Sequence, residues 1–133
     1  MSIEKLENII SDYIEEANVV IKNQKPLSGI FGFGNSIGNN ACHAKFYDAI
    51  SKELSEGDYE PYEAVKFLIY ADRNYECPKS VQMMLTTIQG LAIPFVSSLS
   101  DVQKDEFREY YDKNIKKHYR LPIQDKLYKE LKR

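Results

Sequence analysis

Apolar residues recur every three or four positions along most of the chain, which is the pattern of amphipathic α-helices. The first such segment covers residues 3–21, and its acidic side chains lie largely off the apolar face. Five further segments follow, and their predicted starts are Asn39 or Asn40, Pro61, Ser80, Ser100 and Pro122. The run from Ile93 to Ser97 is the one candidate strand. We therefore predict an all-α fold, a compact single-domain bundle or orthogonal array of about six helices over residues 1–133.

Residue types at the segment ends support these boundaries. Pro61 and Pro122 suit the first turn of a helix, because the N–H that proline lacks has no helical partner there. Ser100 and Gln103 have the S-x-x-Q spacing of a capping box. Pro94 removes one helical hydrogen bond, so we expect it to bend or end the fourth helix.

A Gly/Asn-rich segment, Gly29–Asn40, separates the first two predicted helices and contains four glycines and three asparagines. We predict a loop here, and closely spaced glycines allow backbone N–H groups to approach a phosphate. The segment follows a helix rather than a strand and lacks the lysine of a P-loop, which favours a structural loop or a partner-binding loop. The candidate ligand-binding residues of this loop are Phe31, Gly32, Phe33, Gly34, Asn35 and Ser36.

The pair Cys42-His43 lies at the predicted start of the second helix. N–H groups at a helix start stabilise a thiolate, which would make Cys42 nucleophilic. Adjacent helical residues point about 100° apart, so His43 is poorly placed as the base for Cys42, and His118 is the other histidine. These residues support an alternative function, a small enzyme or a phosphate- or ligand-binding protein. The thiols and imidazoles lack the paired spacing of zinc ligands, so we predict no metal site and no cofactor.

Composition places the chain among ordinary globular domains. It has 133 residues, 43% of them hydrophobic, and a formal net charge of -2. The sequence does not open with a basic segment followed by an apolar run, and Val81–Leu99 is too polar to span a membrane. We therefore expect a cytoplasmic protein without membrane association.

Charge is unevenly distributed along the chain. Residues 113–133 carry a charge of +6 and residues 1–112 a charge of -8. The basic segment is suited to phosphates, but a pI near 5.7 disfavours a dedicated nucleic-acid binder.

Tyrosine is unusually frequent, with ten residues and no tryptophan. Several tyrosines lie among carboxylates in residues 56–76, and tyrosine is enriched at protein–protein interfaces. An acidic surface of this kind would attract a basic partner such as a nuclease. The candidate interface residues are Tyr59, Glu60, Tyr62, Glu63, Asp72, Tyr75 and Glu76.

Short segments in the first half and near the end of the chain resemble segments of known proteins. Gly32-Phe33-Gly34 with Ala41–Tyr47, and Arg120–Gln124 near the end, resemble patterns in small uncharacterised bacterial helical proteins. In size, acidity and predicted helical fold the chain is similar in character to immunity proteins, which neutralise toxins by stoichiometric binding. The resemblance assigns no activity and no role to any residue.

These observations together favour a non-catalytic protein-binding protein. Its most concrete form is a cytosolic immunity-type protein, a monomer or weak dimer, that neutralises a basic toxin domain by direct binding.

Overall fold

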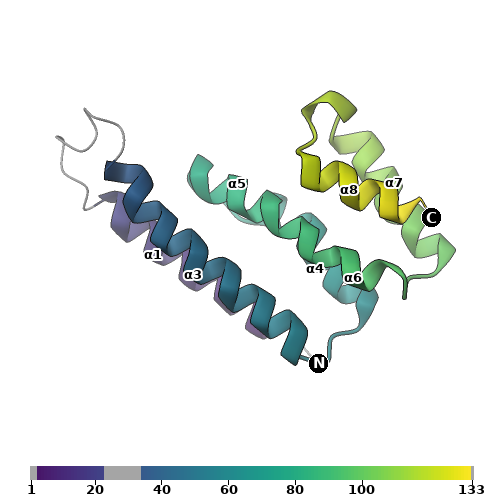
Figure 1. Ribbon diagram of the computed structural model, residues 1–133, viewed down its shortest axis with the longest axis horizontal. Helices are drawn as coiled ribbons and strands as arrows, with labels where there is room; N and C mark the ends of the chain where they lie inside the picture. Colours follow the sequence, from purple (N-terminus) through teal and green to yellow (C-terminus); the bar gives the residue numbers. More distant parts are fainter. Residues whose placement is uncertain (1–2, 23–33, 133) are drawn as a thin grey trace. The chain divides into compact units, whose positions relative to one another are not determined.

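The computed structural model describes residues 3–22 and 34–132. Across these residues the regular structure is helical and no strand occurs, which confirms the all-α prediction (Figure 1). The elements are α1 (Glu4–Lys22), α3 (Gly34–Glu56), α4 (Pro61–Asn74), α5 (Lys79–Thr87), the 3-10 helix η1 (Ile88–Ala92), α6 (Ile93–Val96), α7 (Asp101–Asn114), the 3-10 helix η2 (Lys117–Tyr119) and α8 (Pro122–Leu131). No helix in the described ranges combines the length and the apolar character needed to cross a bilayer.

The chain divides into two compact units. Residues 3–22, 34–58 and 77–84 form one, here called the α1–α3 unit. Residues 59–76 and 85–132 form the other, the α4–α8 unit. The single-domain organisation expected from the sequence stays a prediction.

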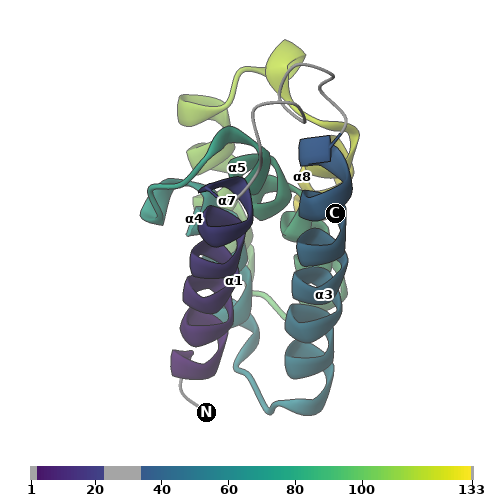
Figure 2. The same ribbon diagram turned by 90° about the vertical axis from the view of Figure 1, so that its left-hand side faces the viewer.

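In the α1–α3 unit, α1 and α3 lie side by side (Figure 2). The buried face of α1 has the predicted spacing of four, three and four residues, and α3 supplies a matching stripe. The buried residues are Leu6, Ile10, Tyr13 and Ala17 on α1, and Cys42, Phe46, Ile50 and Leu54 on α3. Tyr13 and Phe46 stack in parallel with ring centroids 4.1 Å apart.

Helix α3 begins at Gly34, so the prediction that Asn39 or Asn40 caps it is wrong. Glycine and asparagine disfavour a helix by up to about 1 kcal/mol each, which is why the sequence pattern predicts a loop there. The helix is 23 residues long, and the burial of its later turns against α1 stabilises it as a whole. Residues 34–40 of the predicted loop are therefore helical.

Helix α4 supplies much of the core of the α4–α8 unit. Its buried residues are Ala64, Val65, Phe67, Leu68, Ile69 and Ala71. Phe107 and Tyr111 of α7 and Leu127 and Leu131 of α8 are also buried. Glu60 caps α4, because its carboxylate accepts hydrogen bonds from the backbone N–H groups of Tyr62 and Glu63.

The predicted fourth helix is interrupted. Pro94 lies in the first turn of α6, and the chain before it tightens into η1, as expected from the hydrogen bond that proline removes. The candidate strand Ile93–Ser97 is helical over Ile93–Val96. η1 packs against α4 and α8, and it places Gly90 so close to α8 that a Cβ there would lie 2.5 Å from Ile123.

The predicted capping box of α7 is confirmed. The N–H of Ser100 donates to Oε1 of Gln103 at 2.9 Å, and the N–H of Gln103 donates to Oγ of Ser100 at 3.2 Å. Pro122 begins α8 as predicted. Local sequence therefore determines both of these helix starts.

Gln89 of η1 is fully buried and connects several elements of the α4–α8 unit. Its amide Nε2 donates to Oδ2 of Asp72 at 3.3 Å and to the carbonyl of Ile69 at 3.5 Å. Its Oε1 accepts hydrogen bonds from the Tyr111 hydroxyl and, at 3.4 Å, from Nε2 of Gln124. One side chain thus links η1, α4, α7 and α8 in the interior.

Candidate functional site

The candidate ligand-binding loop is only partly within the structure. Phe31, Gly32 and Phe33 lie outside the described residues. Gly34, Asn35 and Ser36 belong to the first turn of α3. Their helical backbone corrects the expectation of an open loop at these three positions.

Cys42 lies well inside α3 rather than at its start, so the expected stabilisation of a thiolate by the helix N-terminus is absent there. The residue is buried, and burial raises the pKa of the thiol, with the nearby Glu16 carboxylate raising it further. A raised pKa keeps the sulfur protonated and weakly nucleophilic. The interpretation of Cys42 as a catalytic nucleophile is not supported by these surroundings.

The imidazole of His43 contacts α1 rather than Cys42. Its Nδ1 forms a hydrogen bond with the hydroxyl of Tyr13. Burial lowers the pKa of His43, and it raises the pKa of Tyr13. A neutral imidazole held by a tyrosine is the ordinary arrangement of a half-buried histidine.

A pocket of about 190 Å³ lies between α1 and α3. Its floor is apolar and includes Cys42 and Phe46, and its rim carries Asp12, Glu16 and Lys45. Lys45 and Glu16 form an exposed ion pair with Nζ and Oε2 3.2 Å apart. His43 is not among the lining residues, so thiol and imidazole do not share this pocket.

His118, the other candidate base, lies in the α4–α8 unit on η2, where its side chain is exposed. Its ring lies beside that of Tyr119, with centroids 4.2 Å apart. Within the described ranges, no group of three or more His, Cys, Asp or Glu side chains could hold a metal ion.

The candidate interface residues fall into several environments. Tyr59 is 6% exposed, so the expectation of a surface ring is wrong for this residue. Glu60 is the cap of α4. Asp72 is half-buried, and its carboxylate accepts hydrogen bonds from Thr86 and from Gln89, while burial raises its pKa. These residues therefore have roles within the fold.

The other four interface candidates are at least partly accessible. Tyr75 is half-buried at the end of α4, and Glu76 beside it is exposed. Tyr62 is half-buried and Glu63 is exposed in the first turn of α4. The hydroxyl of Tyr62 donates to Oε2 of Glu106 on α7 at 2.8 Å, so this tyrosine faces α7.

Tyr62 belongs to a surface that runs along α4 and α7, here called the α4–α7 face. It consists of half-buried tyrosines and exposed charged side chains, namely Tyr62, Lys66, Tyr70 and Arg73 of α4 and Glu106 and Tyr110 of α7. The α4 members follow one another at intervals of four, four and three residues, so they share one side of the helix.

Aromatic contacts hold the rings of the α4–α7 face in place. Tyr62 stacks on the buried Phe107 with centroids 5.5 Å apart. Tyr70 and Tyr110 meet edge to face at 4.5 Å and 90°. The guanidinium of Arg73 lies 5.5 Å from the Tyr110 ring centre, and Nζ of Lys66 lies 5.8 Å from that of Tyr62.

Hydrogen bonding and burial keep these phenols protonated. The hydrogen bond to Glu106 raises the pKa of Tyr62 to about 12, and burial raises that of Tyr110 to about 12. The Tyr62 hydroxyl therefore remains a donor at neutral pH. Glu106 of the face and the neighbouring Glu60 and Glu63 are exposed, so this end of the surface is acidic, whereas Lys66 and Arg73 add positive charge farther along.

Of the six residues of this surface, only Tyr62 was predicted as an interface residue; Lys66, Tyr70, Arg73, Glu106 and Tyr110 were not. The four-residue spacing of Tyr62, Lys66 and Tyr70 was a usable signal, because it predicts one shared side of α4. No sequence signal predicted that Glu106 and Tyr110 of α7 join this surface, because their position depends on which helix packs against α4.

Comparison of the chain with protein-family models, curated protein sequences and solved structures gives no match. The resemblance to immunity proteins accordingly stays a prediction.

Proposed function

We propose that the chain is a non-catalytic protein-binding protein, and that the α4–α7 face is its interface. The observation that carries this proposal is the row of three half-buried tyrosine rings between exposed charged side chains. Tyrosine rings and arginine dominate the binding energy of many interfaces. Their fixed positions here mean that a partner would order few additional side chains, which reduces the entropic cost of binding.

The most concrete form of this function is an immunity-type role in the cytosol, in which the chain covers a basic toxin domain. The carboxylates of Glu60, Glu63 and Glu106 support it, because they would attract lysine and arginine side chains. Glu106 already accepts from Tyr62, and its carboxylate retains lone pairs for a second donor.

Charge reversal at Glu106 of the α4–α7 face and at the neighbouring Glu63 tests this proposal. We expect tagged wild-type chain, expressed in its source cell, to retain one partner at equal stoichiometry. The double variant Glu63→Lys/Glu106→Lys should lose that partner, since like charges would then face its basic surface. Quantitative mass spectrometry of the purified complexes measures the retention.

The matched control is Glu7→Lys/Glu15→Lys, which makes the same change in net charge at exposed positions of α1. It should retain the partner. Absence of any stoichiometric partner from the wild type, or equal loss from both double variants, would contradict the proposal.

A further inference from the structure

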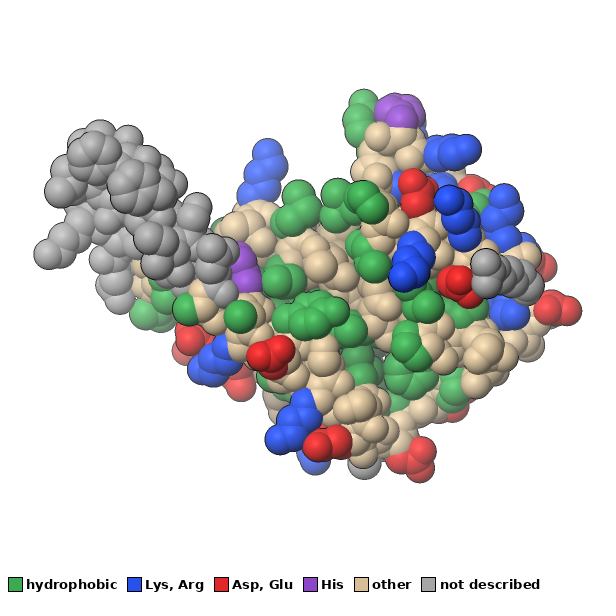
Figure 3. All heavy atoms as spheres, viewed as in Figure 1, with side chains coloured by type: hydrophobic (Ala, Val, Ile, Leu, Met, Phe, Trp, Pro, Cys, Tyr) green, Lys and Arg blue, Asp and Glu red, His purple; other side chains and the backbone are tan. Residues whose placement is uncertain are grey.

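The α4–α8 unit has a hollow that the proposed interface does not include. It has a volume of about 260 Å³ and is formed by the end of α7, η2 and one side of α8. Four lining residues are cations, namely Lys117, Arg120, Lys129 and Lys132. We call this hollow the Arg120 pocket. Figure 3 shows basic side chains gathered over the region where Figure 1 places α8, with acidic side chains among them.

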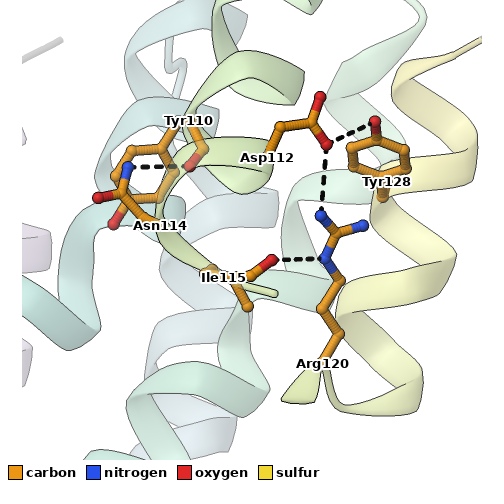
Figure 4. Close-up of polar contacts among 6 residues, drawn as sticks. All are labelled: Tyr110, Asp112, Asn114, Ile115, Arg120 and Tyr128. Atoms are coloured by element: carbon orange, nitrogen blue, oxygen red, sulfur yellow. Dashed lines mark hydrogen bonds and ion pairs between the residues drawn. The ribbon is translucent and has the colours of Figure 1, made fainter. Parts of the chain in front are cut away.

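Arg120 is a buried and fixed cation, with only 6% of its side chain exposed. Its Nε donates to the carbonyl of Ile115 at 3.0 Å, and its Nη2 lies 3.4 Å from Oδ1 of Asp112 (Figure 4). The hydroxyl of Tyr128 donates to the same Oδ1 at 2.9 Å. Figure 4 shows the second terminal nitrogen of Arg120 with no bond to the residues drawn. The guanidinium is therefore held in place with donor capacity left over.

The three lysines line the same hollow as this guanidinium. All three are exposed, and among the described residues none of them forms an ion pair. Lys132 directly follows α8 and lies about one helical turn from both Tyr128 and Lys129. Two cations lie near the Tyr128 ring, with the Arg120 guanidinium 4.4 Å and Nζ of Lys132 5.4 Å from its centre.

Positive charge exceeds negative charge in the pocket. The lining carboxylates are Asp112 and Asp125, so four cations face two anions. Asp112 already bonds to Arg120 and Tyr128, whereas Asp125 opposes the binding of an anion. A group with two negative charges would balance the remaining excess, and its oxygens match the planar donors of a guanidinium.

We propose that the Arg120 pocket binds a small molecule that carries a phosphate or diphosphate group. Arg120 contacts the phosphate oxygens from a fixed position, and Lys117, Lys129 and Lys132 supply the surrounding charge. Asp112 acts as a positioning residue for Arg120. A compact hollow lined by one buried guanidinium and three exposed lysines favours a small phosphorylated ligand over a nucleic-acid strand, which would follow an extended groove.

Pyrophosphate and inorganic phosphate are the probes for this site. In titrations of the isotope-labelled full chain at low ionic strength, the NMR signal of the Arg120 Nε–H should shift and saturate with either probe, with pyrophosphate binding more tightly. The variant Lys129→Gln/Lys132→Gln should bind pyrophosphate about tenfold more weakly, because each lysine provides a charge-assisted contact. The control Lys116→Gln/Lys126→Gln removes the same charge from exposed positions outside the pocket and should bind like the wild type.

Three results would overturn the proposal. The first is a shift that stays linear with pyrophosphate concentration. The second is equal weakening in both double variants, which would indicate diffuse surface charge. The third is a single-stranded RNA that binds more tightly than pyrophosphate and weakens equally in both variants. Circular dichroism of each variant verifies that α8 is intact, since Lys129 and Lys132 also lie near the carbonyl end of that helix.

Discussion

Replacement of Gln89 by alanine is expected to lower the free energy of unfolding by about 3–5 kcal/mol, because several buried polar groups lose their partner together. The side chain is fully buried and has four hydrogen-bond partners. Without it, the Tyr111 hydroxyl and the Gln124 amide lose an acceptor, and Asp72 loses a donor. Urea denaturation followed by circular dichroism measures the change.

Two neighbouring tyrosines provide a matched control for this network. Tyr111→Phe removes the hydroxyl that donates to Gln89 and should cost about 1–3 kcal/mol. The Tyr110 hydroxyl is buried and has no hydrogen-bond partner within residues 3–22 and 34–132, so Tyr110→Phe should leave stability unchanged or raise it. Equal losses from the two variants would argue against a network centred on Gln89.

Substitution of Gly90 by alanine is expected to lower the free energy of unfolding by about 1–3 kcal/mol, the usual cost of overpacking. The added Cβ would lie 2.5 Å from Cγ1 and Cδ1 of Ile123, so α8 must shift or the Ile123 side chain must move. The glycine is required here by the close approach of η1 and α8 rather than by an unusual backbone angle.

A double-mutant cycle identifies the clash as the cause. In an Ile123→Ala background the alanine at position 90 has space, so Gly90→Ala should then cost much less than in the wild type. Urea denaturation of the four proteins gives the coupling energy. Strictly additive losses would show that Gly90 and Ile123 are not in contact.

The helices with strong local signals were predictable from the sequence. α1, α4, α7 and α8 have apolar positions at helical spacing, and proline or a capping box marks the starts of α4, α7 and α8. The start of α3 at Gly34 was not predictable, because packing against α1 outweighs the weak helix propensity of glycine and asparagine. Gln89 gave no sign of its role either, since its partners come from helices distant in sequence.

The surroundings of the candidate interface residues were predictable only in part. Tyr62 and Glu63 are accessible as the acidic, tyrosine-rich pattern of residues 56–76 predicted. Tyr59 and Asp72 belong to the same pattern, but Tyr59 is buried and Asp72 accepts a hydrogen bond from Thr86. Their burial depends on the packing of neighbouring helices, which the local sequence pattern does not specify. The alternative role of Cys42 as a nucleophile depended on a helix start near residue 40, whereas α3 begins at Gly34.

Photo-crosslinking in the source cell tests the role of the α4–α7 face most directly. A photoreactive amino acid replaces Lys66, which is exposed on this face, or Lys52, which is exposed on α3. The proposed function predicts one discrete adduct with a second protein from position 66 and none from position 52. An adduct from position 52 alone, or no adduct from either position, would contradict it.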